Sequence, residues 1–192
     1  RQTSMMERVT PRSEGGPTEN DPADRNGSGD KESEGKRKEA EARDEESKAF
    51  DKIEKEIKDK LAQSKRFENV KDQVTFTREK DGLRIDIIDK ADFAMFGLGT
   101  SKLLPRSDAL VAEVAAAVAK TDNKLAVRGH TDSIPFGPGD DRSNWALSAE
   151  RAESTRQALE KRNIPSSRFA KIEGVADTQP FNSRDPADPR NR

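Results

Sequence analysis

Residues 125–136 read LAVRGHTDSIPF, and the first half of this stretch has the pattern of a strand. Leu125 and Val127 alternate with small or polar residues, as in a β-strand that buries one face. The strand then runs into the tetrapeptide GHTD, which contains His130, the single histidine of the sequence. Four kinds of structure fit such an ending: a catalytic cluster, a metal site, a tight turn or a ligand-binding loop.

Catalysis and metal binding are the weakest of these four interpretations. A nucleophilic site would combine His130, Asp132 and Ser133, but residues this close along one strand end cannot line up in a hydrogen-bonded series. Zinc requires several imidazole or thiolate ligands, whereas the chain has one histidine and no cysteine. We therefore expect no enzyme activity, no metal and no cofactor. The tight turn stays open, because Gly129 would permit an unusual backbone and Asp132 would cap the turn.

The ligand-binding interpretation draws on a helix that the sequence predicts from about Asn144 to Arg162. Asn144 and Arg151 lie two turns apart on one face of that helix. If this face abuts the strand, Asp132 and Arg151 flank one cleft. The carboxylate would take an ammonium group, and the guanidinium would hold a carboxylate in a bidentate pair, which suits a zwitterion. A direct salt bridge between Asp132 and Arg151 fits the residues equally well.

The composition divides the chain into a polar part and a folded part. Charged residues make up 38% of the 192 residues, and the mean hydropathy is −1.05, which is too polar for a single core. The net charge of −1 provides no basic field for nucleic acid, so no nucleic-acid partner is expected. No stretch approaches the roughly 20 apolar residues of a membrane span.

Three segments follow from this division. Residues 1–46 are rich in Gly, Pro, Ser, Glu and Lys and predict a disordered charged linker. Residues 47–66 predict an amphipathic linker helix, which either docks on the following domain or pairs with its copy in a dimer. Residues 67–192 predict the folded domain. The apolar stripe of the helix consists of Phe50, Ile53, Ile57 and Leu61.

The folded domain has the element order β-β-α-β-α-β. Alternating apolar residues flank the turn Asp81-Gly82 and predict a hairpin, and Pro105 marks the start of a helix. The strand before GHTD, the helix from Asn144 and a last strand near Ile172 complete the series. This order predicts an α+β fold, a mixed β-sheet with helices packed on one face.

Residues 89–105 form the loop after the hairpin. Its Gly-x-Gly lacks the third glycine of a nucleotide-binding turn, so no nucleotide site is expected. Asp89 and Asp92 are expected to be solvated turn residues, although they could line the cleft. Trp145 is expected to be a partly buried packing residue, with stacking on a glycan as the alternative. Three apolar residues of the loop are expected to cover the core, with a switchable interface as the alternative: Phe93, Met95 and Phe96.

GHTD, the later LSAERA and the closing pair Asn191-Arg192 resemble the motifs of OmpA-like peptidoglycan-binding domains, in the same order and with similar spacing. The ligand of that family is the meso-diaminopimelate of the peptidoglycan stem peptide, whose side chain ends in an ammonium and a carboxylate on one carbon. The resemblance implies that Asp132 holds the ammonium and that Arg151 holds the carboxylate.

The same resemblance implies the remaining site residues. Thr131 would make main-chain contacts and Asn144 an amide contact with the ligand. Asn191 and Arg192 would lie near the site, with a largely structural role. His130 completes the expected peptidoglycan-binding set, and we expect its imidazole to satisfy local main-chain groups.

A longer series of motifs resembles one branch of the family, the MotB-type subunits that anchor the flagellar motor stator to the cell wall. The series includes MFGLGTSKLLP, GHTDSIPF, SNWALSAERA and DPADPRNR, over roughly residues 70–192. It implies the periplasmic portion of an inner-membrane protein, working as a homodimer beside a MotA-type membrane subunit. The alternative is a passive OmpA/Pal-type envelope linker. That branch also has an upstream ion-conducting membrane helix and a further apolar strand after Asn-Arg, to which we match no segment here.

Overall fold

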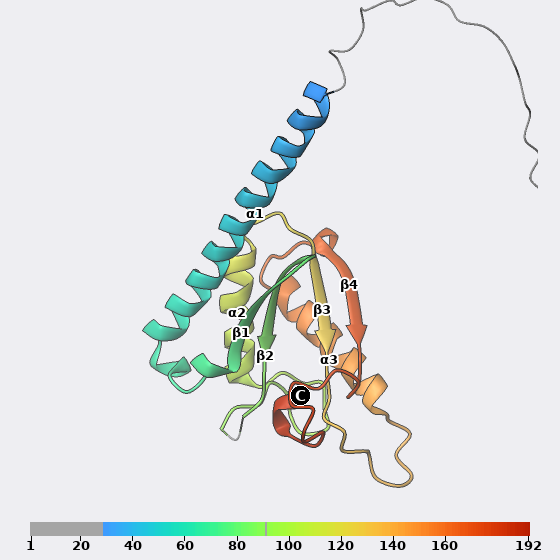
Figure 1. Cartoon of the computed structure of the whole chain (residues 1–192). Helices are drawn as coiled ribbons and strands as arrows, with labels where there is room; N and C mark the ends of the chain where they lie inside the picture. Colours follow the sequence, from blue (N-terminus) through green and yellow to red (C-terminus); the bar gives the residue numbers. More distant parts are fainter. Residues whose placement is uncertain (1–28, 91) are drawn as a thin grey trace, which may run out of the picture. The chain divides into compact units, whose positions relative to one another are not determined.

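The computed structural model describes residues 29–90 and 92–192 of the chain (Figure 1). The linker predicted over residues 1–46 lies outside the described residues up to residue 28. Its prediction as disordered is wrong from Gly29 onward, where the chain is helical. Residues 44–192 form one compact unit, and α1 begins in the preceding one. The helices and strands are α1 (Gly29–Gln63), β1 (Val74–Glu79), β2 (Gly82–Ile87), α2 (Pro105–Val118), β3 (Leu125–Gly129), α3 (Asn144–Glu160) and β4 (Phe169–Gly174).

The four strands of the described residues form two two-stranded sheets. β1 and β2 pair antiparallel through the predicted hairpin, in which Gly82 takes a φ of 141°. β3 and β4 pair parallel, with Val127 opposite Ile172. No ladder joins β2 to β3 within the described residues. The predicted α+β fold is thus confirmed, and its mixed pairing is divided between two separate sheets.

The helices α2 and α3 lie on the same face of the strands (Figure 1). Pro105 occupies the first turn of α2, where its missing N–H leaves no bond unmade. The side chain of Ser143 accepts a hydrogen bond from the amide of Ala146 and caps the start of α3. Within the described residues, no helix combines the length and the apolar character that crossing a membrane requires.

The apolar stripe of α1 is buried in the core of the domain. Ile53, Ile57 and Leu61 are 6%, 0% and 2% exposed, and they belong to the same cluster as Leu110 and Val111 of α2. Of the two roles predicted for this helix, the structure shows docking on the domain.

The helix α1 begins at Gly29, earlier than the start predicted near residue 47, and ends at Gln63. Its first turns carry no apolar stripe, so periodicity gives no sign of them. Ion pairs one turn apart support this polar part, as between Lys38 and Glu34 at 2.9 Å.

Two glycines allow α3 to lie directly on the ends of β3 and β4. A Cβ on Gly129 would lie 1.9 Å from the carbonyl oxygen of Ser148, and a Cβ on Gly174 would lie 2.3 Å from the amide nitrogen of Ala149. Gly129 has no positive φ, so the unusual backbone considered from the sequence is not its role. The glycine is required because helix and strand backbones are in contact there.

Replacing Gly129 with alanine should therefore destabilise the domain by about 3 kcal/mol, the upper end of the cost of overpacking a core. The cost is high because the obstructing carbonyl oxygen of Ser148 belongs to the backbone and cannot rotate away. The measurement is the free energy of unfolding from urea denaturation. Gly137→Ala is the matched control, since nothing lies within 4 Å of a Cβ at that position. Equal stability of the two variants would contradict the contact between α3 and β3.

Candidate functional site

Four charged side chains, which we call the charge cluster, meet where β2 and β3 end. Asp89 follows β2, Asp132 follows β3, Arg151 lies on α3, and Arg192 lies at the end of the C-terminal segment. The Nε atom of Arg192 is 3.0 Å from Oδ2 of Asp132 and 4.0 Å from Oδ2 of Asp89. The two carboxylates and Arg151 are buried. Buried charges of this kind require partners, and the cluster supplies two of each sign.

Asp132 has two functions in this arrangement. Its Oδ1 atom accepts a hydrogen bond from the amide of Ile134 at 3.2 Å, which closes the turn after β3. Its Oδ2 atom pairs with Arg192. The turn expected from the sequence is therefore present, and the acid keeps one oxygen for a cation. Its ion-pair partner is Arg192, in place of the salt bridge with Arg151 that the sequence left open.

The guanidinium of Arg151 is held by main-chain carbonyls and by an aromatic ring. Its Nε donates to the oxygen of Thr100 at 3.1 Å, and its Nη1 donates to the oxygen of His130 at 3.2 Å. The ring centre of Phe96 lies 5.1 Å from the guanidinium carbon. Within the described residues Nη2 has no acceptor, and it is not among the fully buried atoms. This nitrogen is available to an anion.

Thr131 and Asn144 shape the loop between these charges. The amide of Thr131 donates to the oxygen of Ala176 at 3.0 Å, while its Oγ1 is buried without a hydrogen-bond partner among the described residues. The Nδ2 atom of Asn144 donates to the main-chain oxygens of Asp132 and Ile134, at 3.1 and 3.3 Å. Asn144 thus fastens the loop, and its amide hydrogens are occupied.

His130 acts through its main chain. Its carbonyl oxygen accepts the hydrogen bond from Arg151, while its imidazole is half-buried. Burial lowers the pKa of His130, and the positive charges of Arg84 and Arg128 act in the same direction. Both effects favour the neutral imidazole. The ring makes no hydrogen bond to the described residues, so its expected bonding to main-chain groups stays a prediction.

Asn191 holds the C-terminal segment against the loop after β3. Its Oδ1 accepts from the amide of Asn182 at 2.7 Å, and its Nδ2 donates to the oxygen of Pro186 at 3.1 Å. The same oxygen of Pro186 accepts from the amide of Ser133 at 3.0 Å. This network fixes the chain immediately before Arg192, so Asn191 is a positioning residue.

Asp89 is the member of the charge cluster for which the sequence favoured a solvated turn and kept a place at the cleft as the alternative. It is 5% exposed, whereas a solvated turn residue was expected, and its Oδ1 accepts from the amide of Met95 at 2.8 Å. Burial raises the pKa of Asp89, and this outweighs the opposite effects of Met95, Arg192 and Arg151. Its position directly after the apolar run of β2 was the one local signal that this carboxylate points inward.

The expectations for the other residues of the 89–105 loop are confirmed in part, and the expectation for Trp145 is not. Phe93 and Met95 are buried in the core, as predicted, and Asp92 is exposed. Trp145 is 58% exposed, so its predicted packing role is wrong. At the start of α3, Asn144 is bonded to the loop after β3, whereas Trp145 is exposed to solvent.

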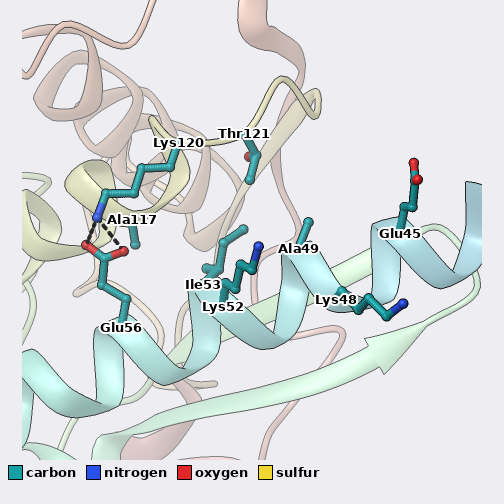
Figure 2. Close-up of a pocket in the computed structure, with 9 residues that line it drawn as sticks. All are labelled: Glu45, Lys48, Ala49, Lys52, Ile53, Glu56, Ala117, Lys120 and Thr121. Carbon is teal, nitrogen blue, oxygen red and sulfur yellow. Dashed lines mark hydrogen bonds and ion pairs between the residues drawn. The ribbon is translucent and has the colours of Figure 1, made fainter.

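A separate groove lies between α1 and the end of α2 (Figure 2). Ala49, Ile53 and Ala117 give it an apolar lining, and Nζ of Lys120 pairs with both carboxylate oxygens of Glu56 at 2.6 and 2.7 Å. No residue of the charge cluster lines this groove. Within the described part of the chain, no group of three His, Cys, Asp or Glu side chains could hold a metal ion.

Comparison with known proteins identifies the family. The model of the OmpA family matches residues 95–192, which contain three of the four residues of the charge cluster. The chain belongs to the OmpA family. Members of the family are non-enzymatic, which agrees with the expectation that His130, Asp132 and Ser133 form no nucleophilic site. Asp89 lies before the matched region of this OmpA-like peptidoglycan-binding domain.

The chain is also similar to proteins of motility and of wall attachment. Motility protein B of Escherichia coli K12 is 33% identical over 114 residues, which are 59% of this chain and 37% of that protein, so the match spans little more than a third of the relative. The cell wall anchor of the T6SS from Pseudomonas aeruginosa has a TM-score of 0.51 and 26% identity, over 63% of this chain and 83% of that one.

A third comparison supports the fold. A MotB-like protein from Desulfovibrio vulgaris superposes with a TM-score of 0.62 at 18% identity, over 77% of this chain and 92% of that one. At this identity the likeness concerns the fold alone.

The raised pKa of Asp89 predicts how stability depends on pH. The folded chain binds a proton at Asp89 more readily than the unfolded chain, in which the pKa of this carboxyl is the ordinary 3.8. The contribution of Asp89 to folding stability is therefore fully present below pH 3.8. It is lost as the pH rises through the folded-state pKa. The stability of the wild type relative to Asp89→Asn should therefore fall as the pH rises from below about 4. Urea midpoints of both proteins at several pH values measure this difference, and a constant difference would contradict the assignment.

Proposed function

We propose that this domain binds peptidoglycan non-covalently through the side-chain end of diaminopimelate, and that it anchors a flagellar stator to the cell wall. The observation that carries the proposal is that Asp132 lies in the loop after β3 and that Arg151 contacts the same loop from α3. Arg151 is bonded to the carbonyl of His130, two residues before Asp132. Each charge has its own partners, and the pair forms no direct ion pair.

This geometry matches the chemistry of a zwitterion. The ammonium of the ligand would pair with Oδ2 of Asp132, and its carboxylate with the Nη2 atom of Arg151. Charge-assisted hydrogen bonds of this type are the stronger ones, and burial of both groups limits competition from water. The unpaired Oγ1 of Thr131 adds a buried hydroxyl beside the loop. A lysine side chain carries the ammonium without the carboxylate, so the site would favour walls that contain diaminopimelate.

The role as a stator anchor is supported by the similarity to Motility protein B. In that role the domain would lie in the periplasm, act as a homodimer beside a MotA-type membrane subunit, and hold the motor against its reaction torque. Two linked domains would bind the wall more firmly than one, because the second attachment is intramolecular.

One observation favours a second candidate, a passive envelope linker of the OmpA/Pal type. The likeness to the T6SS cell wall anchor shows that this fold also occurs in a wall anchor of another machine. Restoration of swimming in a strain that lacks its own stator anchor would support the motor role. Restoration of envelope integrity alone would support the linker.

Binding to the wall is tested by co-sedimentation with purified sacculi of the diaminopimelate and lysine types. Asp132→Asn and Arg151→Ala should each weaken binding to diaminopimelate-type sacculi by about 30-fold, which corresponds to the ~2 kcal/mol lower bound for breaking a buried charge pair. Asparagine at 132 keeps an oxygen for the turn, so the first variant removes the charge with little effect on the loop.

The matched controls are Asp141→Asn, in an exposed loop, and Arg156→Ala, on α3 but with its side chain paired to Glu153 and Glu160. Both controls should bind as the wild type does. Full binding by the Asp132 and Arg151 variants would refute the assigned roles, as would equal binding of the wild type to both kinds of wall.

A further inference from the structure

We propose that Arg192 is an internal competitor for the ammonium of the ligand, and that Asp89 receives Arg192 when the ammonium occupies Asp132. The inference rests on the proposed function and concerns how the same site is regulated. It assigns a part in binding to two residues outside the Asp132 and Arg151 pair.

The competition follows from the oxygens of Asp132. Oδ1 accepts a hydrogen bond from the amide of Ile134, whereas Oδ2 is the oxygen that faces a cation. In the structure this oxygen is 3.0 Å from Nε of Arg192. An incoming ammonium would need the same atom. The guanidinium therefore stands where the positive end of the ligand would bind.

Asp89 is placed to accept the displaced guanidinium. Its Oδ1 is bonded to the amide of Met95, and its Oδ2 is 4.0 Å from Nε of Arg192. A shift of about 1 Å would bring this pair to hydrogen-bonding distance. Asp89 has 6% side-chain exposure, and Arg192 has 20%, so the exchange takes place largely out of water.

The exchange leaves each charge of the cluster with either an opposite charge or main-chain hydrogen bonds. Without ligand, Arg192 neutralises Asp132, while Arg151 is held by the carbonyls of Thr100 and His130. With ligand, its ammonium pairs with Asp132, its carboxylate pairs with Arg151, and Arg192 pairs with Asp89. No buried charge is left without a partner in either state, which is the condition for both states to be stable.

Two consequences follow for recognition. The internal ion pair lowers the apparent affinity, because the ligand binds only the fraction of sites from which Arg192 has moved. It also makes the ammonium essential, since a ligand with a carboxylate alone cannot displace Arg192. The site thereby discriminates against ligands whose side-chain amine is blocked, for instance by a peptide cross-link.

The experiment measures binding of a meso-diaminopimelate tripeptide by calorimetry. Arg192→Gln should bind about tenfold more tightly than the wild type, because the competitor is gone. Asp89→Asn should bind about tenfold more weakly, because Arg192 loses its alternative partner. A merely structural role would weaken binding in both variants, so the opposite signs are the signature of the exchange.

Two controls accompany these variants. Arg190→Gln removes an equal charge two residues away, where the guanidinium pairs with Asp188, and should bind as the wild type does. The same tripeptide with an acetylated side-chain amine should show no gain with Arg192→Gln. Arg192→Lys, which keeps the charge with the smallest change of shape, serves as the second variant and should remain near the wild-type affinity.

Weaker binding by Arg192→Gln, in a variant whose melting curve shows that it is folded, would overturn the inference. So would an equal gain with the acetylated peptide. If Arg192→Gln does not fold, a wild-type-like affinity of Asp89→Asn overturns it. If the wild type binds the tripeptide and neither variant changes the affinity, the proposed function stands and the exchange is refuted. If the wild type does not bind the tripeptide, both are refuted.

Discussion

The contact between the backbone of α3 and the ends of β3 and β4 is the constraint on which the site depends. Only glycine fits at 129 and 174, where a Cβ would collide with the helix main chain. Because α3 lies this close, the guanidinium of Arg151 donates a hydrogen bond to the carbonyl of His130, and the hydroxyl of Ser148 accepts one from the amide of Ala176. The packing of the domain and the geometry of the ligand loop therefore have the same cause.

The charges impose a second constraint. Asp89, Asp132 and Arg151 are buried, and the desolvation of such groups is tolerated only with nearby counter-charges and hydrogen bonds. The C-terminal segment meets this requirement by bringing Arg192 to the two carboxylates, while Asn191 fixes the segment through main-chain hydrogen bonds. With two charges of each sign the cluster is balanced without a ligand, while Oγ1 of Thr131 and Nε of Arg192 stay buried without a hydrogen bond among the described residues.

The sequence predicted those features that depend on neighbours along the chain. Alternation predicted the hairpin around Gly82, periodicity predicted the buried stripe of α1, and GHTD marked the loop after β3. It could not predict the partner of Asp132, because the ion pair with Arg192 joins residues 60 positions apart. The inward position of Asp89 and the exposure of Trp145 were missed for a related reason, since tertiary packing decides both.

The central claim concerns which group of the ligand meets which residue, and a crystal structure with the meso-diaminopimelate tripeptide bound tests it most directly. The account predicts the side-chain ammonium within hydrogen-bonding distance of Oδ2 of Asp132 and the adjoining carboxylate on the guanidinium of Arg151. A tripeptide bound in the opposite orientation, or bound in the groove between α1 and α2, would contradict it.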